Sequence, residues 1–317
     1  MDLMRSTERQ NKPGSTLFKS FPVRKLWHSD LATAVVFLLP SITILSLFSI
    51  YPIFEAFRLS FFRWDNLAPV KDFIGLQNYI FLFKSARFWN SMYVTAKYTL
   101  VVNTVSISIG LVLAVVLNNR YLAFKSFWRS LYFLPIVTPT VAAAMVWILL
   151  FNPGFGYVNV LLRTFHLPSL NWLADRTWAL PTVMTLGIWR RLGFNMILYL
   201  AAIQSLPKEV YESAEVDGAN AWQRFIHLTI PLLHGTTIML IILGVIDSFL
   251  TFDQVLVLTR GGPANATEVI GMFMYSNSFS LFKLGYGSAI SMVMFLAIAL
   301  FTLMQWRFTG FGSNEES

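Results

Sequence analysis

The chain of 317 residues contains no cysteine, which excludes disulfide bonds and thiolate metal sites. It is also short of charge, because charged residues make up 13% of the chain against about 25% in soluble domains. The four histidines are too dispersed along the sequence to predict a metal cluster. This composition therefore supports neither a water-exposed surface nor a resident metal ion.

Several catalytic motifs are also missing. The sequence has no G-x-x-x-x-G-K-[ST] phosphate loop, so we expect no ATP hydrolysis by this chain itself. It has no H-E-x-x-H zinc motif, no G-x-S-x-G nucleophile elbow, and no filter or ring of charges typical of a channel. These absences favour a transport subunit without its own motor, and a membrane enzyme is the least supported class.

Apolar residues dominate what is present, since 56% of the chain is hydrophobic and 16% aromatic. Apolar runs of about twenty residues are long enough to cross about 30 Å of hydrocarbon. The sequence therefore predicts an all-α membrane protein that lies among membrane lipids and has six transmembrane helices. We expect these helices at 31–54, 93–117, 131–151, 178–203, 232–256 and 285–306.

The ends of the chain predict its orientation. Residues 1–30 are basic and lack the apolar core of a signal peptide, so they predict a cytoplasmic N-terminal tail ahead of the six-span domain at 31–306. Six spans place the short tail 307–317 on the same side. The basic residues of the N-terminus and of the 119–130 loop favour the cytoplasm for that side. Other basic residues are scattered over loops, so nucleic-acid binding is not indicated.

A polar stretch at 205–231 interrupts the apolar runs between the fourth and fifth predicted spans. Pro207 suits a first helical turn, and Asp217-Gly218 is a turn signal, so the stretch predicts a helix, a turn and a second helix at 219–228. An acidic face on the first helix is formed by Glu209, Glu212 and Glu215. A folded element between two spans predicts a docking surface, and an ordinary surface loop is the alternative.

Charged residues also occur inside predicted spans. Arg190-Arg191 lie near the middle of the fourth span, and Asp247 and Asp253 lie late in the fifth. Charge at the centre of a membrane is costly, so such residues usually face protein or a wet cavity. The sequence leaves two interpretations open: these side chains line a polar cavity, or they reach the membrane interface.

The 205–231 stretch resembles a known family. Glu212-Ser213-Ala214, Asp217-Gly218-Ala219, Phe225 and Ile230-Pro231 are similar to the E-A-A-x-x-D-G-A…F…L-P signature of binding-protein-dependent ABC importer permeases, with Ser213 in place of the first Ala. The stretches 195–207 and 258–267 resemble the sugar-uptake branch, which includes the maltose and glycerol-phosphate transporter membrane subunits. The resemblance covers nearly all of the chain after about residue 30.

This resemblance implies a type I ABC importer permease fold, with a cytoplasmic coupling helix between spans four and five, in a bacterial inner membrane. It implies a second homologous permease, two ATPase subunits that bind ATP and Mg, and an extracytoplasmic solute-binding protein that delivers a sugar-like substrate. The chain itself would bind no cofactor. The implied ATPase-coupling residues are Glu212, Ser213, Ala214, Asp217, Gly218 and Ala219.

For the substrate path, the resemblance points to the spans on either side of the coupling element. The expected path residues are Leu192, Gly193, Asn195, Met196, Asp247, Ser248 and Thr251. Helix packing is the alternative for each of them, because Ser and Thr commonly join membrane helices. Two other functions stay open: import of a glycerol phosphate ester with Arg190-Arg191 as anion ligands, and a stand-alone secondary carrier or channel.

Overall fold

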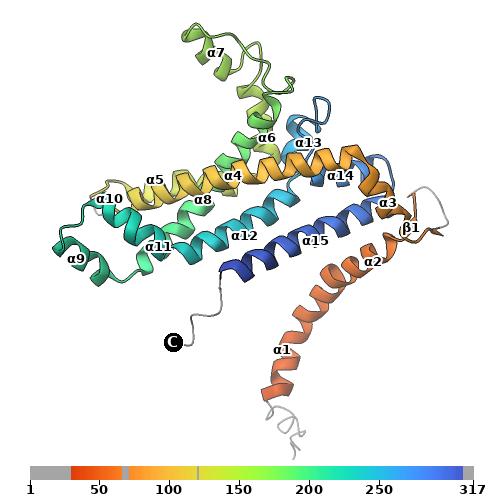
Figure 1. Ribbon diagram of the computed structural model, residues 1–317, viewed down its shortest axis with the longest axis horizontal. Helices are drawn as coiled ribbons and strands as arrows, with labels where there is room; N and C mark the ends of the chain where they lie inside the picture. The colour runs from red at the N-terminus through yellow and green to blue at the C-terminus, as the bar shows by residue number, and fades with distance from the viewer. Residues whose placement is uncertain (1–29, 66–70, 120, 310–317) are drawn as a thin grey trace, which may run out of the picture. The chain divides into compact units, whose positions relative to one another are not determined.

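The computed structural model describes residues 30–65, 71–119 and 121–309, and nearly all of its regular elements are helices (Figure 1). The predicted all-α class is therefore confirmed. The predicted N-terminal tail before Asp30 and the tail after Thr309 lie outside the described residues. The chain divides into two compact units, residues 1–55 and residues 56–317.

The described part of the first unit is one helical run. It consists of α1 (Asp30–Leu45), η2 (Ser46–Ile50) and the start of α2 (Tyr51–Leu59). Its apolar side chains are exposed on all sides, as at Phe37 and Phe48, which are 67% and 76% exposed. A helix that is apolar all round needs lipid or another protein around it, in agreement with the first predicted span.

In the second unit, the end of α2 is followed by a small antiparallel hairpin that the sequence patterns do not predict. Strand β1 (Phe62–Arg63) pairs with β2 (Asp72–Phe73), with Phe62 opposite Phe73. Helix α3 (Gln77–Lys84) follows, and its buried Asn78 donates from Nδ2 to the carbonyls of Ser60 and Phe62, at 2.8 and 3.0 Å. These bonds satisfy backbone groups beyond the two-residue ladder.

Four long helices form the body of the second unit: α4 (Ala86–Asn118), α8 (Ala179–Ser205), α12 (His234–Leu250) and α15 (Leu284–Thr309). Small residues let them approach closely. A Cβ on Gly110 of α4 would lie 2.8 Å from the Cβ of Asn195 on α8, so only glycine fits there. Next to this contact, Ala114, Met196, Tyr199 and Leu240 form a buried cluster.

Two of the predicted spans are broken. The run at 131–151 is divided into α5 (Lys125–Val137) and α6 (Thr140–Leu150), which meet at 100°, because Pro139 disfavours helical geometry at the residue before it. The run at 232–256 ends as α12 at Leu250 and resumes as α13 (Asp253–Leu258). Pro135 and Pro139 in the third apolar run predict a break near its start, and the structure has that break at Pro139.

The number of spans is not settled by the described helices. Three described helices are long and apolar enough to cross a membrane, at Ala34–Leu59, Ala86–Asn118 and Leu284–Arg307. The number rises to five if each of two bent helix pairs is one span, and these pairs are Lys125–Val137 with Thr140–Leu150 and Ala221–Leu232 with His234–Leu250. Six spans are thus not confirmed. Helix α8 occupies the fourth predicted span but falls short of the same apolar criterion, since Arg190 and Arg191 lower its mean hydropathy.

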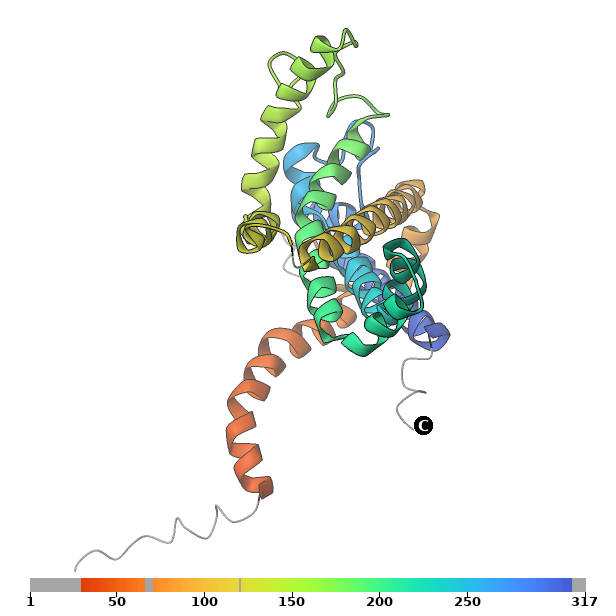
Figure 2. The same ribbon diagram turned by 90° about the vertical axis from the view of Figure 1, so that its left-hand side faces the viewer.

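Shorter helices connect these elements. Figure 1 shows α9 and α10 at one end of the long helices, and β1 and α3 at the other. The view along the long axis in Figure 2 shows α6 and α7 extending away from the bundle. The shorter helices are α7 (Tyr157–Thr164), α9 (Lys208–Val216), α10 (Ala221–Arg224), η3 (Phe225–Thr229), α11 (Ile230–Leu232), α14 (Ile270–Tyr275) and η4 (Ser276–Ser280).

Candidate functional site: a polar cavity and a capped turn

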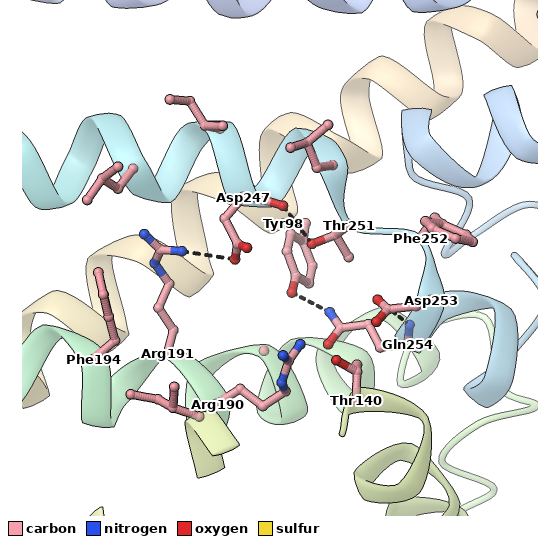
Figure 3. Close-up of a pocket in the computed structure, with 15 residues that line it drawn as sticks. Tyr98, Thr140, Arg190, Arg191, Phe194, Asp247, Thr251, Phe252, Asp253 and Gln254 are labelled. Carbon is pink, nitrogen blue, oxygen red and sulfur yellow. Dashed lines mark hydrogen bonds and ion pairs between the residues drawn. The ribbon is translucent and has the colours of Figure 1, made fainter. Parts of the chain in front are cut away.

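A cavity of about 550 Å3 lies where the two broken helices come together (Figure 3). Ile136 and Thr140 line it from either side of the α5–α6 break, and Thr251 and Phe252 line it from the α12–α13 break. Non-helical backbone at membrane depth is tolerated only where it is buried in protein or faces a water-filled space. The two breaks therefore border a cavity with a polar lining among apolar helices.

An ion pair crosses the cavity from α8 to α12. Arg191 Nη1 lies 2.9 Å from Asp247 Oδ2, and the two side chains are 9% and 68% exposed. Among the described residues, Nε and Nη2 of Arg191 and Nε of Arg190 have no hydrogen-bond partner. Figure 3 shows both arginines reaching from α8 toward the cavity. The site thus offers guanidinium donors and an accessible carboxylate.

The opposite wall is fixed by a buried hydrogen bond between α13 and α4. Gln254 Nε2 donates to the hydroxyl of Tyr98, and both side chains are almost fully buried. Gly187 of α8 makes room for this phenol, because a Cβ at that position would collide with the Tyr98 hydroxyl. The contact ties the short helix after the break to two long helices.

Polar and aromatic groups complete the lining. Thr251 Oγ1 donates to the carbonyl of Asp247 at 3.0 Å, and Asp253 Oδ1 accepts from the backbone N–H of Gln254 at 2.8 Å. The Phe252 ring stacks on Tyr275 with centroids 5.1 Å apart, and Phe194 offers a second ring. Hydrogen-bonding groups beside apolar ring faces suit a small, hydroxyl-rich ligand.

Only two of the seven expected path residues line this cavity, Asp247 and Thr251. Gly193 packs against the backbone carbonyl of Tyr132, and Met196 lies in the buried cluster. Asn195, which is fully buried, donates from Nδ2 to Ser106 Oγ at 3.0 Å.

The remaining two path residues also lie outside the cavity. Ser248 is 1% exposed and donates to the carbonyl of Gly244 at 2.7 Å, and Leu192 is half-buried and does not line the cavity. The structure thus brings Asp247 and Thr251 together with Arg190-Arg191. Gly193, Asn195, Met196 and Ser248 lie in helix packing, and Leu192 lies outside the cavity lining.

Sequence reasoning missed Tyr98 and Thr140 as lining residues. A proline directly before Thr140 signals the helix break, and this pattern could have pointed to the cavity edge. Tyr98 carries no such signal, because its partner Gln254 is distant in sequence and meets it only in the folded bundle.

The predicted turn between α9 and α10 has the geometry that its glycine requires. Gly218 has φ of +81°, and the N–H groups of Gly218 and Ala219 bond to the carbonyls of Glu215 and Ala214, at 3.1 and 2.9 Å. This is a Schellman arrangement, in which glycine takes the left-handed position after the helix. The turn expected at Asp217-Gly218 is confirmed.

The second helix begins two residues later than predicted, at Ala221, because Asn220 caps it. Asn220 Oδ1 accepts from the N–H of Gln223 at 2.9 Å, and Gln223 Oε1 accepts from the N–H of Asn220 at 2.8 Å. An ion pair of 2.8 Å between Glu215 and Arg224 joins the two helices. The 205–231 stretch is thus a folded element.

This element presents an exposed surface. Glu212, Ser213, Asp217 and Gly218 are exposed, while Ala214 and Ala219 are half-buried. Two apolar side chains, Val216 and Trp222, are 88% and 67% exposed. A hollow of about 370 Å3 is lined by Ala214, Asp217, Gly218, Ala219, Gln223, Arg224, His227 and Leu228. Exposed apolar groups beside a hollow are typical of a protein-binding surface.

Apolar helices, two helix breaks around a polar cavity and a folded element between long helices define a membrane transport subunit. The family model described as "binding-protein-dependent transport system inner membrane component" matches residues 106–308. The chain belongs to this family, as the resemblance in the 205–231 stretch predicts.

Relatives of known name cover most of the chain. It is 34% identical over 283 residues to a probable ABC transporter permease, YurN, of Bacillus subtilis, a match that spans 88% of this chain and 97% of the relative. It is 33% identical over 280 residues to the trehalose/maltose transport system permease MalF of Thermococcus litoralis, which spans 88% of this chain and 94% of the relative.

A solved structure shares the fold. The crystal structure of a bacterial alginate ABC transporter, in complex with an alginate pentasaccharide-bound periplasmic protein, contains a chain that superposes with a TM-score of 0.77 at 22% identity. The match covers 91% of this chain and 96% of that chain. The expected permease fold is confirmed, apart from the number of spans.

Proposed function

We propose that this chain is the permease subunit of a binding-protein-dependent ABC importer for a sugar or oligosaccharide. It forms half of the translocation path in a bacterial inner membrane, beside a second homologous permease. The observation that carries the proposal is the polar cavity at two helix breaks in a chain of this family. Relatives named for trehalose/maltose and arabinooligosaccharide transport support the solute class.

The α9–α10 element is the proposed joint with the motor. Its exposed face, including Glu212, Ser213 and the turn at Gly218, inserts into a cleft on one of two ATPase subunits, which bind ATP and Mg and carry out the hydrolysis. This places the 205–231 stretch and both termini in the cytoplasm. The rigid cap at Asn220 supports the role, because a fixed turn transmits movement better than a loose loop.

The cavity is the proposed sugar path. Asp247 and Thr251 contact the solute together with Arg190-Arg191. Gly193, Asn195, Met196 and Ser248 pack behind them and hold the helices in place. Leu192 lies on α8 next to Arg191 and Gly193.

The charges of the cavity favour an uncharged solute. Two arginines, Arg190 and Arg191, face two carboxylates, Asp247 and Asp253, so the lining has no excess of either sign. An uncharged sugar uses such donors and acceptors equally, whereas a phosphate ester requires a surplus of cations.

Co-purification of the native complex tests the proposal. The complex, with its solute-binding protein, is placed in nanodiscs, and ATP hydrolysis is measured with a panel of neutral sugars and with glycerol phosphate esters. We expect a neutral sugar to raise the rate. Transport by the purified chain alone, without ATP or partners, contradicts the proposal. Stimulation only by a phosphate ester contradicts the solute class alone.

A further inference from the structure

A second hollow, of about 460 Å3, lies at the end of the bundle opposite α9 and α10, where β1 and α3 are seen in Figure 1. Three cations from distant parts of the sequence line it: Arg63 of β1, Arg87 in the first turn of α4, and Lys283 just before α15. The fold therefore brings together three basic residues that are far apart in the sequence.

The backbone fixes two of these cations in place. Arg63 lies in the strand pair, opposite Asp72, and the N–H of Lys283 donates to the carbonyl of Asn277 at 2.9 Å. Neither side chain has a carboxylate of a described residue within 4.0 Å. Asp65, which forms a bridge with Lys283 through the backbone, is the carboxylate among the described lining residues.

The third cation is held by a buried acid. Arg87 donates from Nε and Nη2 to Glu268 at 2.7 and 2.5 Å, and Glu268 is 1% exposed. A further cation lies beside the wall of the hollow, because the Lys71 ammonium is 4.0 Å from the ring centre of Trp64. Glu268 compensates the charge of Arg87, so the positive charge of the hollow that has no carboxylate partner among the described residues comes from Arg63 and Lys283.

Basic residues at this end run against the charge bias of membrane proteins. Lys and Arg are concentrated on the cytoplasmic side, and the proposed function places this hollow on the other side. Membrane orientation therefore does not explain the basic residues of this hollow. A cationic hollow is, however, complementary to an acidic group on a partner. The three cations come from β1, from the first turn of α4 and from the residue before α15, so they lie where these helices begin.

We propose that this hollow is a docking socket for an acidic side chain of the extracytoplasmic solute-binding protein. The inference rests on the proposed function, and it adds which residues receive the partner and which charge the partner carries. Arg63 and Lys283 supply the free positive charge, and Arg87 with Glu268 forms the fixed floor.

The test uses the complete transporter in nanodiscs of neutral phosphatidylcholine, titrated with the solute-binding protein that co-purifies with it. The Arg63→Glu/Lys283→Glu variant is expected to raise the half-stimulating concentration of binding protein at least about ten-fold, equivalent to about 1.4 kcal/mol. Basal ATP hydrolysis and melting temperature should stay unchanged. Raising salt from about 50 to about 300 mM should weaken binding for the native protein more than for the variant.

The matched control is Lys84→Glu/Arg176→Glu, which makes the same charge change at exposed sites that do not line the hollow. We expect its half-stimulating concentration to stay within about two-fold of the native value. Equal weakening by both variants, or none by Arg63→Glu/Lys283→Glu, overturns the proposal.

A lipid phosphate is the competing occupant, and the lipid composition separates the two. If the variant differs from the native protein only in vesicles that contain phosphatidylglycerol, the hollow takes an anionic headgroup and the proposal fails. If the native complex shows no stimulation by binding protein at all, the proposed function fails instead.

Discussion

Arg191 and Asp247 form an ion pair in which one partner is buried and the other is exposed. Their nitrogen and oxygen atoms are 2.9 Å apart, yet the arginine side chain is 9% exposed and the aspartate 68%. The arginine therefore depends on its partner, whereas the aspartate is open to water or solute. A charge so exposed within an apolar helix is expected to face the wet path and not lipid.

This asymmetry predicts unequal effects of removing either partner. Asp247→Asn leaves a buried guanidinium without its acid and should destabilise the protein by about 2–3 kcal/mol. Arg191→Met leaves a hydrated carboxylate and should be milder. Thermal unfolding of the purified complex measures both, with Arg191→Met/Asp247→Leu as the reference for loss of the pair. Equal shifts for the two single variants contradict the prediction.

The Arg87–Glu268 pair should be the most sensitive ion pair among the described residues. Arg87→Ala leaves a carboxylate that is 1% exposed without a partner, a change expected to cost about 3–5 kcal/mol. Arg224→Ala is the matched control, because its partner Glu215 is 70% exposed and the pair should contribute about 0–1 kcal/mol. Melting temperatures in one detergent compare them, and similar losses would show that burial of Glu268 does not matter.

Gly193→Ala should reveal a packing role. Alanine normally stabilises a helix relative to glycine by about 1 kcal/mol. At this position the added Cβ meets the Tyr132 carbonyl, so α5 and α8 must separate, and we expect a net loss of about 1–3 kcal/mol. Gly154→Ala is the control, since its Cβ would meet Asn152 Oδ1 at an ordinary 3.5 Å. A stabilised Gly193→Ala protein with altered sugar preference would instead favour direct solute contact.

Gly218 and Glu212 test the proposed coupling joint. A Cβ at Gly218 meets nothing within 4 Å, so its φ of +81° is the constraint within this chain. Gly218→Asn should be tolerated because Asn accepts left-handed geometry, whereas Gly218→Trp and Glu212→Ala should abolish solute-stimulated ATP hydrolysis without unfolding the spans. Normal coupling in reconstituted Gly218→Trp transporters would exclude this joint.

The sequence predicts much of this fold because local chemistry decides it. Apolar length marks α4 and α15, and Gly218 marks the turn. The capping pair Asn220 and Gln223 could also have been read from its spacing, which would have placed the start of α10 correctly. Pro139 signals a break in the third apolar run, but the angle of 100° depends on what α5 and α6 pack against.

The candidate site is only partly predictable for the same reason. Arg190-Arg191 and Asp247 stand out as charges in apolar runs, so their cavity is foreseeable. Tyr98 and Gln254 look like ordinary polar residues until the bundle joins them. Arg63 and Lys283 line the same hollow, although they lie near opposite ends of the sequence of the second unit. No local sequence pattern predicts that they come close together.

The length of α4 has a mechanical consequence. Its 33 residues extend about 50 Å, well beyond about 30 Å of hydrocarbon. One uninterrupted rod therefore carries Arg87 at the basic hollow, Tyr98 at the cavity and Ala114 beside the start of α12. Because a hydrogen-bonded helix resists stretching, a shift along its axis at one end must appear at the other. Docking of the binding protein, binding of the solute and movement of the ATPase subunits would then all act on α4 as one rigid helix.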